Sequence, residues 1–132
     1  MHPGQEPTFL PLTIAAAEHG SEAATVRRRA EEADIAAAGC WAALLGGCES
    51  SERKALPLRL RVLAEATSEY VGTGRWYEPG SAHRRRVAEA QLRINDAVRE
   101  GDGAEFAEAF VGYDQAIATA VVSARNSMES QT

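Results

Sequence analysis

The chain has 132 residues and a formal net charge of −5. This length favours a single domain with its own core. The acidic balance argues against general nucleic-acid binding, which needs a surplus of Lys and Arg to neutralise phosphates. Hydrophobic residues make up 45% of the chain and aromatic residues only 6%. Alanine supplies a large share of the hydrophobic residues. Since alanine is the best helix former and its small side chain lets helices approach closely, we expect tightly packed helices.

The start of the chain has neither the basic region nor the apolar run of a secretory signal. No stretch of about 18 apolar residues is present to cross a bilayer. Thirteen of the fourteen basic residues are arginine, which together with abundant Ala and Gly is typical of a high-GC, bacterial coding bias. We therefore expect a soluble, cytoplasmic protein whose two cysteines are reduced.

Three helices are expected in the first half of the chain, after a flexible tail over residues 1–10. The first is short and runs from Pro11 to Glu18, where His19 and Gly20 end it. Ser21 is a good N-cap for the second, which Gly46 and Gly47 end. The inward positions of the second helix follow steps of three and four residues: Ala23, Val26, Ala30, Ala33, Ala37, Trp41 and Leu44.

The third predicted helix carries an apolar stripe at Leu56, Leu60, Leu63, Thr67 and Tyr70. Pro57 complicates its start, because proline is tolerated only in the first turn of a helix. Either the helix begins near Leu56, or it begins near Ser51 and kinks at the proline, and we favour the first alternative. The alternating residues of "LPLRLRVL" also fit a strand, but the continuation "AEATSEYV" keeps helical spacing and favours a helix.

The last two helices form a predicted hairpin. Ser81 is the N-cap of the fourth helix, which ends at Gly101, and Asp102 with Glu105 three residues later is typical of a capping box. Because two or three residues join these helices, they should lie antiparallel. The inward positions are Val87, Ala90, Ile94 and Val98 in the fourth helix, and Phe106, Phe110, Tyr113, Ile117, Ala120 and Ala124 in the fifth.

These elements predict an all-α fold, specifically a four-helix up-and-down antiparallel bundle with a short additional N-terminal helix. A single domain over residues 11–125 would be followed by a second flexible tail over residues 126–132.

Neither a metal site nor a cofactor site is expected. The three histidines, His2, His19 and His83, lack the spacings that put two ligands on one helical face. Cys40 and Cys48 do not form a Cys-x-x-Cys motif, and Cys40 beside Trp41 should pack as a small apolar group.

The charged clusters on the helices fit solvated faces. Arg27, Arg28 and Arg29 precede several acidic residues, so we expect i,i+3 and i,i+4 ion pairs there. The paired carboxylates likewise lie on polar faces, where nothing raises a pKa for acid–base catalysis.

The stretch "RWYEPGSAHRRR", residues 75–86, is the candidate site. With Ser81 as N-cap, the residues from His83 to Arg86 fall in the first turn of a helix and just beyond it. A helix N-terminus carries partial positive charge, and each exposed cation there costs about 0.3–1 kcal/mol. A bound anion would offset this cost, and neighbouring aromatic rings could stack on a planar ligand or anchor a partner. The candidate residues are Arg75, Trp76, Tyr77, His83, Arg84 and Arg85.

A purely structural role is the alternative for this stretch. Trp76 and Tyr77 would then cover the end of the bundle, and the arginines would pair with acidic residues of another helix or with Glu78.

Three functions follow from these observations, and no catalytic residue is assigned. The first is a non-enzymatic interaction module that binds a protein partner or a second copy, as a possible homodimer. The second is a sensor or binding protein for a small anionic, aromatic ligand at the N-terminus of the fourth helix. The third is a small helical enzyme, for which His83 beside Tyr77 and Glu78 is the only cluster to consider. We favour the first, with no nucleic-acid or membrane partner.

Overall fold

The protein is all-α throughout the part of the chain that the computed structural model describes, residues 8–18, 23–47 and 51–130. The six helices in these residues are α1 (Pro11–Ala16), α2 (Ala24–Gly46), α3 (Ser51–Val71), α4 (Thr73–Trp76), α5 (Ala82–Glu100) and α6 (Gly103–Ser130). The sequence predicts five helices, and the additional one is the single turn of α4. None of the helices in these residues is both long and apolar enough to cross a membrane.

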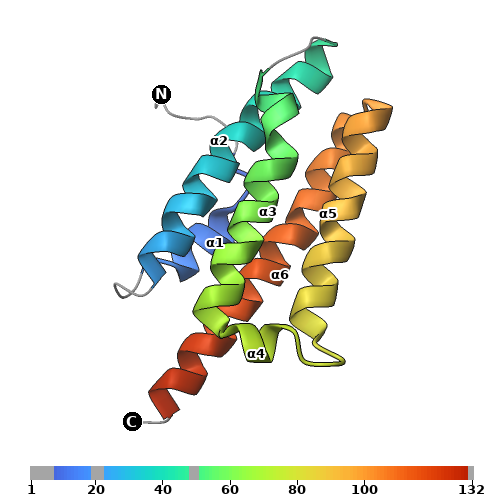
Figure 1. The fold of residues 1–132 in the computed structure, drawn as a ribbon. Coiled ribbons are helices and arrows are strands. Elements are labelled where there is room, and N and C mark those ends of the chain that lie inside the picture. The colour runs from blue at the N-terminus through green and yellow to red at the C-terminus, as the bar shows by residue number, and fades with distance from the viewer. Residues whose placement is uncertain (1–7, 19–22, 48–50, 131–132) are drawn as a thin grey trace.

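The four long helices lie alongside one another in two neighbouring pairs, α2 with α3 and α5 with α6 (Figure 1). The short α1 packs against α6 and α2, and α4 crosses the lower end of the molecule between α3 and α5 (Figure 1). The end of α3, the turn of α4 and the start of α5 therefore meet at one end of the fold.

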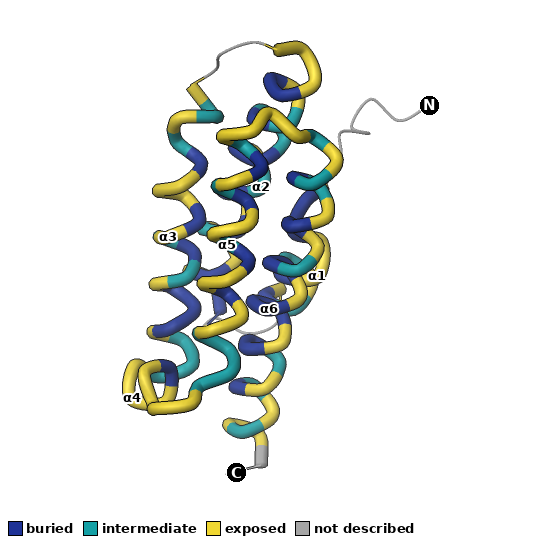
Figure 2. Tube along the Cα trace, turned by 90° about the vertical axis from the view of Figure 1, so that its right-hand side faces the viewer, coloured by how far each residue is buried: buried dark blue, intermediate teal, exposed yellow. Residues whose placement is uncertain are grey.

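The core occupies the space between the long helices, and the buried positions of each helix face inward (Figure 2). All six predicted inward positions of α6 are buried. In the predicted stripe of α2 every residue is buried except Trp41, which is half-buried. Cys40 is fully buried, as expected of a small apolar group. The helical period therefore predicted most inward positions correctly, because one face of each helix must leave water, although Tyr70 and Val98 are only half-buried.

The described end of the predicted N-terminal tail belongs to the core instead. Phe9 and Leu10 are buried, and the Phe9 ring makes edge-on contacts with the rings of Trp41, Phe106 and Phe110 at centroid distances of 5.4–5.9 Å. Burial of both side chains and the edge-on ring contacts offset the conformational freedom that Phe9 and Leu10 lose.

Two carboxylates hold the segment that leads into α1. Asp34 accepts hydrogen bonds from the backbone N–H groups of Phe9 (2.7 Å) and Leu10 (3.0 Å). Asp114 accepts from those of Leu12 (3.0 Å) and Thr13 (2.8 Å). The first N–H groups of a helix have no partner inside the helix, so these side chains of α2 and α6 take the place of a local cap.

The start of α3 differs from the alternative that we favoured. The helix begins at Ser51 and continues through Pro57, so the proline lies within the helix and not in its first turn. Pro57 is exposed on the outer side of the helix, while Leu56, Leu60 and Leu63 are buried. Because the helix continues before the proline, Glu52 lies against Gly39 of α2. A Cβ atom added to Gly39 would lie 2.6 Å from the Glu52 Cγ, which is too close for any residue other than glycine unless Glu52 shifts.

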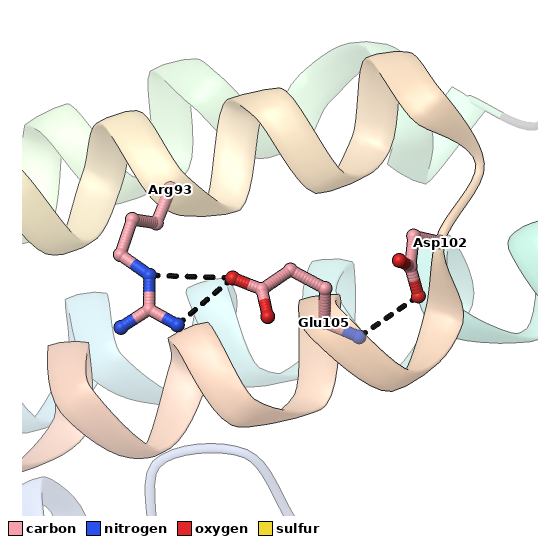
Figure 3. Close-up of polar contacts among 3 residues, drawn as sticks. All are labelled: Arg93, Asp102 and Glu105. Atoms are coloured by element: carbon pink, nitrogen blue, oxygen red, sulfur yellow. Dashed lines mark hydrogen bonds and ion pairs between the residues drawn. The ribbon is translucent and has the colours of Figure 1, made fainter.

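The connection between α5 and α6 follows the prediction in part. Gly101 ends α5 with a positive φ of 70°, and the Asp102 carboxylate accepts a hydrogen bond from the Glu105 N–H at 3.0 Å. The Glu105 carboxylate does not return to Asp102 as in a capping box but pairs with Arg93 of α5 at 2.8 Å (Figure 3). At the other end α6 continues to Ser130, past residue 126 where a tail was expected.

Candidate functional site

The stretch from Arg75 to Arg86 spans the end of α4, a turn and the beginning of α5 at the lower end of the molecule (Figure 1). Gly72 separates α3 from α4 with a φ of 105° that other residues rarely adopt. Ser81 caps α5 as predicted, and its Oγ accepts a hydrogen bond from the Arg84 N–H at 3.4 Å. Local sequence signals thus place the turn between two helix ends.

Trp76 is a core residue. Only 4% of its surface is exposed, and it packs at the end of the hydrophobic core. The indole therefore covers the end of the fold, as the structural alternative expects, and contributes little to the outer surface.

Tyr77 has the opposite environment, with 62% of its surface exposed. The guanidinium carbon of Arg84 lies 5.7 Å from the centre of the Tyr77 ring, which is a cation–π distance. The structure therefore brings together two of the predicted site residues, an exposed ring and a half-buried arginine, which we call the Tyr77–Arg84 pair.

The three consecutive arginines of α5 do not form one patch, because successive residues of a helix point about 100° apart. Arg84 reaches Tyr77, Arg85 is exposed, and Arg86 lines a groove of about 380 Å³ between α5 and α6 that also includes Arg93 and Glu89. The predicted set of site residues is therefore divided over separate surfaces.

The expected pairing of these arginines with acidic residues is not found. Within the described residues no carboxylate lies within ion-pair distance of Arg75, Arg84, Arg85 or Arg86. Arg75 donates one hydrogen bond, to the Ser127 Oγ at 3.3 Å. By contrast, the predicted pairing on α2 is present between Arg29 and Glu32 at 3.1 Å. The positive charge at the start of α5 thus has no counter-charge in the described chain.

Three predicted site residues meet in a pocket of about 270 Å³. Arg75 and Trp76 of α4 and His83 of α5 line it, together with Glu78 of the turn. The opposite lining comes from α6, through Ala120, Ser123 and Ala124. The α6 residues were not recognised as site residues in the sequence, because they lie about forty positions away and carry no motif.

Two buried polar atoms at the start of α5, one of them on the pocket residue His83, lack a hydrogen-bond partner. They are the His83 Nδ1 and the Arg84 Nε, and no other buried side-chain nitrogen or oxygen of the described residues is in this state. Buried polar groups in folded proteins nearly always have a partner, and an unpaired one costs about 1–3 kcal/mol. Both atoms lie in the first turn of α5, so the polar groups of this end are incompletely satisfied within the chain.

The site holds cationic and aromatic groups but no recognisable catalytic arrangement. His83 and Glu78 line the same pocket, although no hydrogen bond joins them in the structure of the described residues. Over the described ranges no three His, Cys, Asp or Glu side chains are close enough to hold a metal ion. His2, His19 and Cys48 lie outside the described residues. The arrangement fits recognition of negative charge.

Comparisons of the chain with protein-family models, with curated proteins and with solved structures found no match.

Proposed function

We propose that the chain is a cytoplasmic, non-enzymatic interaction module that binds an acidic segment of a partner protein through the Tyr77–Arg84 pair. In this proposal the scaffold is a four-helix up-and-down bundle of α2, α3, α5 and α6, with α1 and α4 as short additions.

The observation that carries the proposal is the exposed Tyr77 ring with an arginine held beside it. Tyr77 is 62% exposed, and Arg84 lies 5.7 Å from its ring centre. Tyrosine and arginine are enriched among the residues that dominate binding energy at interfaces, because both offer a large contact area and a polar group. An arginine already placed against the ring loses less side-chain freedom when a partner binds.

The charge distribution indicates the chemistry of the partner. Between residues 75 and 86 there are four arginines and one carboxylate, Glu78, in a chain whose net formal charge is −5. A partner carboxylate would give these arginines the counter-charge that the described chain does not provide. Complementary charge also accelerates encounter and selects against basic partners.

Binding of labelled peptides tests this proposal. A polyglutamate peptide should bind the protein, an uncharged polyglutamine peptide of equal length should not, and added salt should weaken the binding. Tyr77→Ala and Arg84→Ala should each weaken it at least about fivefold, the effect of losing about 1 kcal/mol. Leu92→Ala is the matched control, because Leu92 lies on α5 and is 64% exposed. Equal binding of both peptides, or equal effects of all three substitutions, would contradict the proposal.

A small anionic ligand is the second candidate, and the pocket with its unpaired His83 Nδ1 favours it. Inorganic phosphate or benzoate should then raise the melting temperature of the protein. Arg75→Ala and His83→Ala should remove this shift, whereas Arg86→Ala should retain it because Arg86 lines a different groove. If neither compound raises the melting temperature of the unmodified protein, ligands of these two kinds are ruled out.

A further inference from the structure

The groove between α5 and α6 is a hollow that the proposed function does not use. Its volume of about 380 Å³ falls within the range of about 300–1,000 Å³ that is typical of small-molecule sites. The floor consists of small residues, Ala90 of α5 with Gly112 and Ala116 of α6. Both alanines are buried, so the groove exists because these positions carry no larger side chain.

Gly112 is not required by the fold. It lies in the interior of the long helix α6, and its φ is not positive. A Cβ atom added to it would meet no other atom within 4 Å, whereas at Gly39 and Gly103 an added Cβ would collide with a side chain of another helix. Glycine is the least favourable residue in a helix interior after proline. Gly112 therefore weakens α6 without a packing reason, and it leaves the helix backbone open to the approach of another molecule.

Two opposite charges face the groove without pairing. Arg86 and Glu89 are exposed, lie one helical turn apart on α5 and line the groove. Arg29 and Glu32 of α2 have the same order and spacing and form an ion pair of 3.1 Å. Arg86 and Glu89, by contrast, form no ion pair with one another or with any other side chain that the structure describes. The groove thus offers one cation and one anion at the same end.

The remaining polar residues of the groove differ in how far they are already engaged. Gln115 and Thr119 of α6 are exposed on the wall opposite α5, and their side chains have no hydrogen-bond partner in the described part of the chain. Arg93, farther along α5, is held by the Glu105 carboxylate at 2.8 and 3.3 Å (Figure 3). The polar groups that remain available therefore lie near the first half of α5.

We propose that this groove binds a small zwitterion, namely a free α-amino acid with an apolar side chain. Its carboxylate pairs with Arg86 and its ammonium group pairs with Glu89. Side chains three residues apart on a helix are about 5–6 Å apart at Cβ, which is close enough to reach both charges of one amino acid. Gln115 and Thr119 donate further hydrogen bonds to the carboxylate. The apolar side chain lies over Gly112 and the two alanines of the floor.

The site goes beyond the proposed function and does not depend on it. Arg84 and Arg86 are two positions apart and so point about 200° apart around α5, and Arg84 reaches Tyr77. Loss of amino-acid binding and loss of acidic-peptide binding are therefore separable results. Because both charges of the groove are exposed, we expect a dissociation constant on the order of 1 mM.

Titration of the ¹⁵N-labelled full chain, followed by NMR, tests the ligand class. Leucine should bind and shift the backbone amide signals of Gly112 and Ala116. Leucinamide lacks the carboxylate and 4-methylpentanoate lacks the ammonium group, so each should bind at least about tenfold more weakly. No binding of leucine, equal binding of all three compounds, or shifts that leave Gly112 and Ala116 unaffected would overturn the proposal.

Charge-neutral variants of α5 test the two proposed ion pairs. Arg86→Gln and Glu89→Gln should each weaken leucine binding at least about fivefold. Arg85→Gln is the matched control, because Arg85 is an exposed arginine of the same helix that does not line the groove. This variant should bind leucine like the unmodified protein. An equal loss in Arg85→Gln, or no loss in the other two variants, would contradict the assignment of the charges.

Substitution of Gly112 separates a ligand site from a structural role. Gly112→Ala should raise the melting temperature, because alanine is the better helix former and its Cβ meets no other atom within 4 Å. The same variant should weaken leucine binding, and Gly112→Leu should weaken it further because the larger side chain fills the groove. Unchanged leucine binding in both variants would overturn the placement of the amino acid over Gly112.

Discussion

At the scale of single residues, Tyr113 shows how one polar group is kept inside the core. Its ring is fully buried, and its hydroxyl donates a hydrogen bond of 2.7 Å to the backbone carbonyl of Leu60 on α3. Burial disfavours the ionised form and raises the pKa of the Tyr113 hydroxyl. The residue therefore joins α6 to α3 only while it is protonated.

Alkaline pH should consequently destabilise the fold through Tyr113. In the unfolded chain a tyrosine loses its proton at a pH of about 10, while folded Tyr113 keeps its proton to higher pH. The stabilisation is therefore complete below about pH 10 and is lost as the pH rises further. Urea unfolding should show that Tyr113→Phe costs about 1 kcal/mol at neutral pH and that this difference shrinks above pH 10. A difference that does not change with pH would contradict the assignment.

Asp114 is a buried residue that attaches α1 to α6. Its carboxylate accepts hydrogen bonds from two backbone N–H groups of α1. Asp114→Asn keeps the shape of the side chain but removes its charge and turns one acceptor into a donor. We expect a loss of about 2 kcal/mol in the free energy of unfolding, as for hydrogen bonds to charged groups. Asp96→Asn is the control, since Asp96 is exposed and pairs only with Arg99. Equal effects of the two substitutions would show that Asp114 does not hold α1.

At the scale of elements, α3 shows a proline inside a helix that tertiary packing maintains. Pro57 cannot donate the hydrogen bond that the helix expects at its position, yet α3 extends six residues before it. Pro57→Ala restores an N–H group and should stabilise the protein by about 1–2 kcal/mol, less than the full helix penalty of proline because the unfolded chain also gains freedom. Chemical denaturation measures this change, and a destabilised variant would show that the proline fits its place better than we infer.

Helices with a clear apolar period were predictable from sequence, and so were their local caps. Ser81 and Asp102 cap α5 and α6 as expected, because an N-cap depends on residues within three positions. The start of α3 and the docking of Phe9 were not predictable, since both depend on contacts with distant residues such as Gly39 and Trp41.

The candidate site was predictable only as a stretch of sequence. The cap at Ser81 correctly placed the arginines in the first turn of α5 and just beyond it. Sequence could not show that Trp76 turns inward while Tyr77 turns outward, because their environments are set by packing of α4 on the end of the core. Nor could it show that α6 forms one wall of the pocket beside His83.

At the scale of the whole molecule, the fold separates two surfaces of different chemistry. The Tyr77–Arg84 pair lies where α4 meets α5, and the exposed apolar side chains of Ile35 and Leu45 lie on α2.

Photo-crosslinking in cells tests the central claim, that Tyr77 lies in a protein interface, most directly. A benzophenone amino acid replaces Tyr77 in one variant and Leu92 in another, since both positions are more than 60% exposed. We predict a discrete protein adduct from position 77, mapped to an acidic segment of the partner, that weakens with Arg84→Ala and is absent from position 92. The same adducts from both positions, or none from position 77, would contradict the account.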